Sequence, residues 1–183
     1  MTASRLDLSL YADPGHDPRV EGFTHGERGT LLDYLDNYRL TLAVKCAGLT
    51  PEQLATRAVP PSALSLLGLV RHVGGVEHSW WRRVMGRDLA LTRLYRDEQG
   101  KDTSFAGAEP TQECVDAAFE VWRREVAHAD EYLAGVDDLA ARGTHSDGEV
   151  ELREVLVHLI EEYARHCGHL DLLRECIDGR TGQ

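Results

Sequence analysis

The segment from Glu151 to Gly179 reads ELREVLVHLIEEYARHCGHLDLLRECIDG and carries the clearest secondary-structure pattern in this 183-residue chain. Its apolar side chains recur every three or four residues, which is the period of one face of an α-helix. Gly179 follows the last of them and is a typical helix stop. The pattern predicts a helix over about 151–177 with an apolar face made of Leu152, Val155, Leu156, Leu159, Tyr163, Leu170, Leu172 and Leu173.

The same helix carries a polar stripe. At about 100° per residue, His158, Glu162, His166 and His169 fall within an arc of ~80°. A glutamate and a histidine four residues apart can reach one ion, and imidazole with carboxylate suits Zn²⁺, Ni²⁺, Fe²⁺ or Mn²⁺. Two ligands from one helix cannot close a site. The third candidate is His72, which has apolar neighbours in another predicted helix.

A simpler interpretation of these residues stays open at this point. A single histidine on an apolar helix face is more often a hydrogen-bonded core residue than a metal ligand. Glu162 can also pair with Arg165 on the helix surface. The spacing alone favours a metal site only slightly over these alternatives.

Three more segments show the helical period, at 27–47, at about 62–86 and at 111–135. After the first of them, Thr50-Pro51-Glu52-Gln53 predicts a capped short turn. The connection 87–110 is long, and such connections are often functional or cross over the fold.

The region before the last helix reads as a polar linker, and no part of the chain shows strand-like alternation. Four amphipathic helices without a sheet predict an all-α protein, an antiparallel four-helix bundle with a long loop between its second and third helices. The bundle spans 27–179, preceded by an N-terminal arm at 1–26 and followed by a tail at 180–183.

Composition restricts the function. The net charge of −11 and the scattered basic residues make nucleic acid an unfavourable partner. No stretch approaches the ~20 apolar residues of a membrane span, and the N-terminus does not read as a secretory signal, so we expect a cytoplasmic protein. The four cysteines form no CxxC motif and are expected to be reduced. The faces of the bundle leave room for a homodimer.

Two segments resemble a known family. The run from Glu161 to Glu175 is similar to the last-helix signature of DinB-like proteins, and the run from Leu69 to Trp81 resembles the second helix of the branch that contains mycothiol-dependent S-transferases and maleylpyruvate isomerases. The likeness covers about 27–179. It implies a four-helix bundle that binds a divalent metal, commonly zinc, through His72, Glu162 and His166. Glutamate replaces the histidine of more distant members, which favours the thiol-transferase side.

The resemblance also implies roles for the other histidines and a reaction. His158 and His169 are expected to lie behind the ligands or to line the pocket. A low-molecular-weight thiol such as mycothiol would be activated by the metal and attack an electrophilic small molecule. The family's isomerases carry a further C-terminal domain, and the chain ends at Gln183, so we expect a detoxifying transferase.

Two alternatives remain open from the sequence. One is a metal-dependent hydrolase in which Glu77 or His169 carries a proton. The other is a non-catalytic stress protein that binds a metal or a small molecule. Apart from the ligands, the sequence assigns no catalytic residue, although Glu77 and Asp171 lie in suitable places.

Overall fold

The computed structural model describes Arg19 and residues 24–181. Within this part of the chain the protein is mostly helical, with one small two-stranded sheet, which confirms the prediction of a helix-dominated fold. Most of the predicted N-terminal arm at 1–26 and part of the predicted tail at 180–183 lie outside the described residues.

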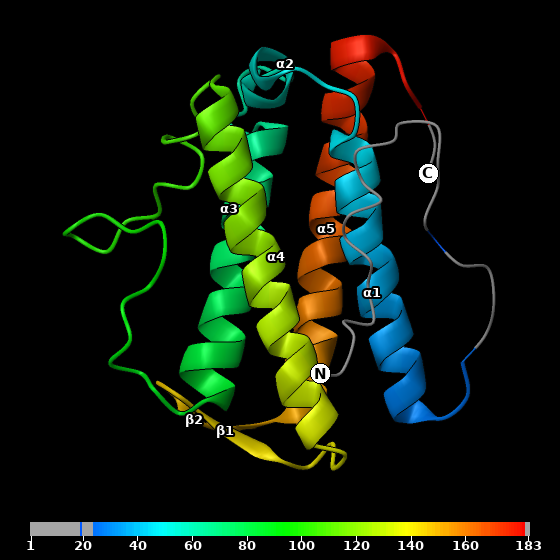
Figure 1. Cartoon of the computed structure of the whole chain (residues 1–183), viewed down its shortest axis with the longest axis vertical. Coiled ribbons are helices and arrows are strands. Elements are labelled where there is room, and N and C mark those ends of the chain that lie inside the picture. The colour runs from blue at the N-terminus through cyan, green and yellow to red at the C-terminus, as the bar shows by residue number, and fades with distance from the viewer. Residues whose placement is uncertain (1–18, 20–23, 182–183) are drawn as a thin grey trace.

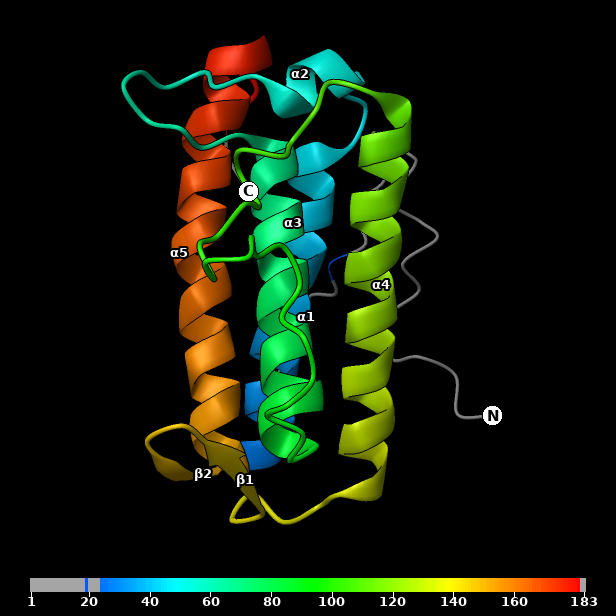
Figure 2. The same cartoon turned by 90° about the vertical axis from the view of Figure 1, so that its left-hand side faces the viewer.

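Four long helical segments lie side by side (Figures 1 and 2). They are α1 (Glu27–Cys46), α3 (Leu66–Glu77) with its π-helical continuation η2 (His78–Met85), α4 (Gln112–Gly135) and α5 (Leu152–Asp178). A short helix, α2 (Pro51–Ala55), lies between α1 and α3. Among the described helices, none is long and apolar enough to cross a bilayer.

The long segments do not simply alternate in direction. Figure 1 shows α1 and α5 running toward one end of the molecule and α3 and α4 running toward the other. The most extensive helix contacts join α1 to α5 and α3 to α4, so both of these pairs are parallel. The antiparallel arrangement that we predicted is wrong for these pairs. The reason is the connection 87–110, which returns along α3 as a crossover before α4 begins (Figure 2).

The helices begin at the residues that local chemistry favours. Thr50 forms a capping box with Gln53 at the start of α2, with Pro51 as the first helical residue. Ser65 caps α3 by accepting a hydrogen bond from the Gly68 amide, and Thr111 caps α4 in the same way. Such caps satisfy amide groups that have no partner within the helix. The predicted helix starts are therefore confirmed to within a few residues.

A β-hairpin occupies the place of the predicted polar linker. Strands β1 (Arg142–His145) and β2 (Gly148–Glu151) pair in antiparallel register. The prediction of no strand is wrong here because each strand has only four residues and shows no apolar alternation. Tertiary packing holds the hairpin against the end of η2: a Cβ atom at Gly143 would lie 2.8 Å from the carbonyl oxygen of Val84.

A polar network is buried inside the apolar core. The Glu77 carboxylate accepts hydrogen bonds from Arg39 Nε and Nη2, each at 2.8 Å, from Trp81 Nε1 at 2.6 Å and from the Tyr163 hydroxyl at 2.8 Å. Trp122 Nε1 in turn donates to the Tyr163 oxygen. All five side chains are fully buried. The structure does not support the proton-carrying role considered for Glu77, because its carboxylate is inaccessible and already occupied.

Candidate metal centre

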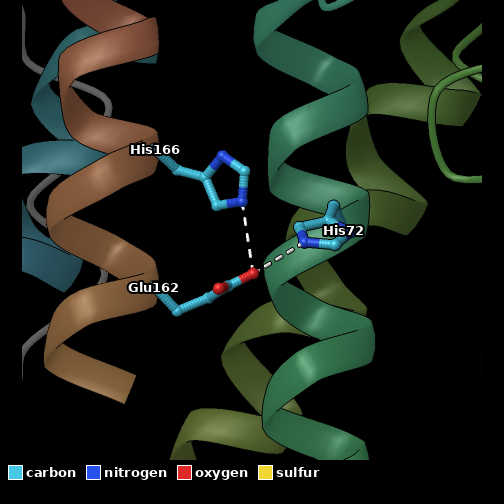
Figure 3. A group of neighbouring side chains, drawn as sticks. All are labelled: His72, Glu162 and His166. Carbon is cyan, nitrogen blue, oxygen red and sulfur yellow. Dashed lines mark hydrogen bonds and ion pairs between the residues drawn. The ribbon is translucent and has the colours of Figure 1, made fainter. Parts of the chain in front are cut away.

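Three side chains from two helices converge between α3 and α5. His72 lies on α3, whereas Glu162 and His166 lie four residues apart on α5 (Figure 3). Glu162 Oε1 is 3.0 Å from His72 Nε2 and 3.3 Å from His166 Nε2. The three donor atoms all lie within 4.8 Å of one another. The structure thus brings together the three residues that the sequence indicated as metal ligands.

Each imidazole ring is also held at its other nitrogen. His72 Nδ1 lies 3.3 Å from Oδ2 of Asp102, which belongs to the crossover connection, and His166 Nδ1 lies 3.2 Å from Nδ1 of His169. In metal sites, partners of this kind fix the tautomer and the orientation of a ligating histidine. Here they leave both Nε2 atoms facing the same Glu162 oxygen.

Charge couples the members of this group. Hydrogen bonds from His166 and His72 hold the pKa of the Glu162 carboxyl well below its usual range. Burial acts to lower the pKa of His72, but hydrogen bonds and charge from Glu162 and Asp102 outweigh burial and raise it. Burial and the nearby His166 lower the pKa of His169. A proton shared with Glu162 therefore competes with any cation for His72.

The donor set fits a divalent cation. Two imidazole nitrogens and one carboxylate oxygen make a set that catalytic zinc sites use, with a fourth position left open. Donors ~2.1 Å from one tetrahedral ion lie ~3.4 Å apart, close to two of the separations found here. The side chains of His72, Glu162 and His166 are 19%, 17% and 11% exposed, so an ion can reach them. The alternative pairing of Glu162 with Arg165 is wrong, since Arg165 bonds Glu161.

A cavity of about 340 Å³ opens beside this group and reaches it at His72. Its walls come from α3 and η2, from the connection 87–110, from the hairpin and from His158 on α5. The Trp80 ring packs between His158 and His145, with ring centroids 4.7 Å and 5.7 Å away. The long connection 87–110, which we expected to be functional or to cross over the fold, thus forms one wall of the cavity. Trp80 is partly buried: it packs against the hydrophobic core and also lines this wall.

His78 and Asp171 lie away from the three-residue group. His78 is buried, with Nε2 3.1 Å from the Thr92 carbonyl oxygen and Nδ1 3.4 Å from Glu125. Asp171 forms an ion pair with Lys45 at 2.5 Å. These contacts give both residues a structural explanation and leave them no part in the site.

Sequence reasoning missed Asp102 and the basic residues of the cavity, Arg83, Arg93 and Arg96. Asp102 is 30 residues from His72 and lies in a segment without a helical period. The one available signal was the length of the connection 87–110, which indicated a functional segment without indicating which of its residues take part.

These features define a class: a helix-dominated protein with a His₂Glu group, suited to a divalent cation, beside a small-molecule cavity. The family model of the mycothiol-S-transferases matches residues 30–179 of the chain. The protein therefore belongs to the mycothiol-S-transferase family, within the DinB-like superfamily, and the resemblance seen in the two helices is confirmed. A search of curated proteins found no match to the chain.

Proposed function

We propose that the protein is a metal-dependent S-transferase that joins mycothiol, or a similar low-molecular-weight thiol, to an electrophilic small molecule. The observation that carries this proposal is the convergence of His72, Glu162 and His166 beside a cavity, in a member of the mycothiol-S-transferase family. We also assign the four long helices to a DinB-like four-helix bundle, because two of them supply all three of these residues.

His72, Glu162 and His166 would hold the ion, and Zn²⁺ suits two imidazoles and a carboxylate best. When bound, a divalent cation supplies Lewis acidity that keeps a neighbouring thiol deprotonated near neutral pH. Asp102 and His169 orient the two imidazoles through their Nδ1 atoms, so that the Nε2 lone pairs face inward. This preorganisation lowers the cost of assembling the site.

The cavity residues position the electrophile and exclude water from it. Trp80 and His158 supply a flat, partly buried wall against which an apolar substrate can pack. The transfer forms one S–C bond, the leaving group departs with its electron pair, and the thiol proton passes to solvent. Holding both reactants in one cavity contributes to the rate through proximity.

The hydrolase alternative loses one of its two proton carriers, because Glu77 is fully buried and bonded to Arg39. His169 remains, but it contacts His166 and does not line the cavity. No observation in the described residues favours hydrolysis over thiol transfer, so we retain a single proposed reaction.

The test is thiol consumption by zinc-loaded protein mixed with mycothiol and 1-chloro-2,4-dinitrobenzene. We expect a rate well above that of buffer, loss of this rate on His166→Ala, and retention on Glu161→Gln, which removes a neighbouring surface carboxylate. Metal content and circular dichroism are measured on each variant. If the metal-bound, folded wild-type protein consumes the thiol no faster than buffer does, the transferase proposal is refuted.

A further inference from the structure

The cavity beside His72 is rich in arginine. Arg83 from η2 and Arg93 and Arg96 from the connection 87–110 line it, and Asp102 is its only acidic lining residue in the described part of the chain. The whole chain carries 31 acidic against 20 Lys and Arg side chains, a net charge of −11. The cavity therefore reverses the sign of the surrounding protein, which is the pattern of a pocket that concentrates anions.

The three arginines are held in different ways. Arg83 donates from Nε to the Leu91 carbonyl oxygen and from Nη2 to that of Leu89, each at 2.8 Å, so its charge meets no carboxylate there. Arg96 Nη2 lies 3.6 Å from Asp102, which also contacts His72. Arg93 makes no hydrogen bond or ion pair with the residues that the structure describes. The Arg83 guanidinium is thus held in position, and the Arg93 guanidinium is available to bind a ligand.

The two guanidinium groups of Arg83 and Arg93 repel each other. Burial, and next the charge of Arg93, lower the pKa of Arg83, and the nearby Asp88 only partly offsets them. Two guanidinium groups that lie close together without a shared carboxylate cost free energy until an anion joins them. An anionic ligand would supply this missing charge.

The other residues of the cavity wall indicate which kind of molecule would accompany the anionic group. Trp80, stacked on His145 with an interplanar angle of 12°, presents an aromatic face, and Leu89 adds an apolar surface. Aromatic and apolar walls with a few convergent polar groups are typical of sites for small organic molecules. A flat apolar body that bears one anionic group matches both parts of the cavity.

We infer that Arg83 and Arg93 form an anion subsite that selects electrophiles bearing a carboxylate on an apolar, preferably aromatic, body. The inference rests on the proposed transferase function. Mycothiol carries no carboxylate, so the anion belongs to the electrophile. Arg93 is the specificity-determining residue because it has no competing partner among the described residues, and Arg83 supports it from η2.

Binding is measured first, without any reaction. Isothermal titration compares the inert anion 3,5-dinitrobenzoate with neutral 1,3-dinitrobenzene. We expect Arg93→Gln to weaken binding of the anion about 10-fold, as loss of one charge-assisted hydrogen bond does, and to leave the neutral compound unchanged. Arg93→Lys should restore part of the loss. The matched control Arg57→Gln removes an exposed arginine near α2, outside the cavity, and should change neither constant.

Turnover is measured next with mycothiol and the pair 4-chloro-3,5-dinitrobenzoate and 1-chloro-2,4-dinitrobenzene. In both reactions an S–C bond forms, the C–Cl bond breaks, chloride leaves and the thiol proton enters solvent. We expect Arg93→Gln to lower kcat/KM about 10-fold for the anionic electrophile alone.

The outcomes separate the inference from the proposed function. If anion binding depends on Arg93 but no thiol turnover occurs, the transferase proposal is refuted and the anion subsite is supported. Turnover of both electrophiles with equal effects of Arg93→Gln would keep the transferase and overturn the subsite. Glutathione bears carboxylates, so it is also tested as the thiol with the neutral electrophile. If Arg93→Gln lowers this activity specifically, the arginine binds the thiol rather than the electrophile, and the inference is overturned.

Discussion

Two polar clusters between α3 and α5 use a glutamate in opposite ways. Glu77 on α3 is fully buried and accepts from Arg39, Trp81 and Tyr163. Glu162 on α5 is partly exposed and offers one oxygen to two imidazoles at once. The donors around Glu77 cannot leave, whereas imidazoles can exchange a proton for a cation. We infer that the saturated cluster around Glu77 fixes the helices, whereas the exchangeable cluster around Glu162 is suited to bind a metal ion.

The largest effect is expected at the saturated cluster. Glu77→Gln leaves the Arg39 guanidinium buried without its main counterion, and breaking such a pair costs about 3–5 kcal/mol of unfolding free energy. Urea denaturation of the metal-free protein measures it.

At pH 8, Glu162→Gln should cost about 1 kcal/mol of unfolding free energy, because it removes hydrogen bonds at a site that is partly exposed to solvent. Equal costs for Glu77→Gln and Glu162→Gln would remove the distinction between the two clusters.

A third carboxylate, Glu125, extends the comparison to pH. Burial acts to raise its pKa, but the nearby His78 and the hydrogen bonds from Arg82 and Arg124 outweigh burial and lower it from 4.5 to about 2. Because the folded pKa is depressed, the stabilisation is present above the unfolded pKa and is lost as pH falls from about 4.5 toward 2.

The pKa difference for Glu125 corresponds to about 3 kcal/mol. We expect Glu125→Gln to be less stable than wild type by up to this amount at pH 6, with the difference shrinking on acidification. Denaturant titrations at pH 6, 4 and 3 follow it. A difference that stays constant with pH would show that the ion pairs do not carry the effect.

The last of these effects concerns metal affinity rather than folding stability, and it lies at Asp102, which supports the exchangeable cluster. Asp102→Asn weakens the partner of His72 Nδ1, and loss of such a partner typically costs 10–100-fold in metal affinity. Competition with a chromogenic zinc chelator measures it. Glu98→Gln removes an exposed carboxylate of the same connection and should leave the affinity unchanged. Equal affinity of Asp102→Asn and wild type would exclude the positioning role.

Much of this arrangement could be predicted because it follows from the local periodicity of the sequence. The apolar stripe of α5 and the spacing of Glu162 and His166 follow from helical geometry alone. Asp102 could not be found in this way, since its approach to His72 depends on the path of a crossover. The direction of α4 depends on the same path. The hairpin at 142–151 was missed because packing against η2, rather than strand pattern, stabilises it.

The π-helical segment η2 has a consequence for which sequence changes the protein tolerates. The Gly86 amide bonds the Trp81 carbonyl five residues earlier, so this turn contains one residue more than an α-helical turn. The extra residue changes the rotation of the residues within and after this turn, and Arg83 lies within it. Substitutions in η2 alter one contact each, but a single-residue deletion would turn the rest of the segment about the helix axis. We therefore expect the number of residues in η2 to matter more than their identity. A single-residue deletion there should destabilise the protein far more than a substitution does.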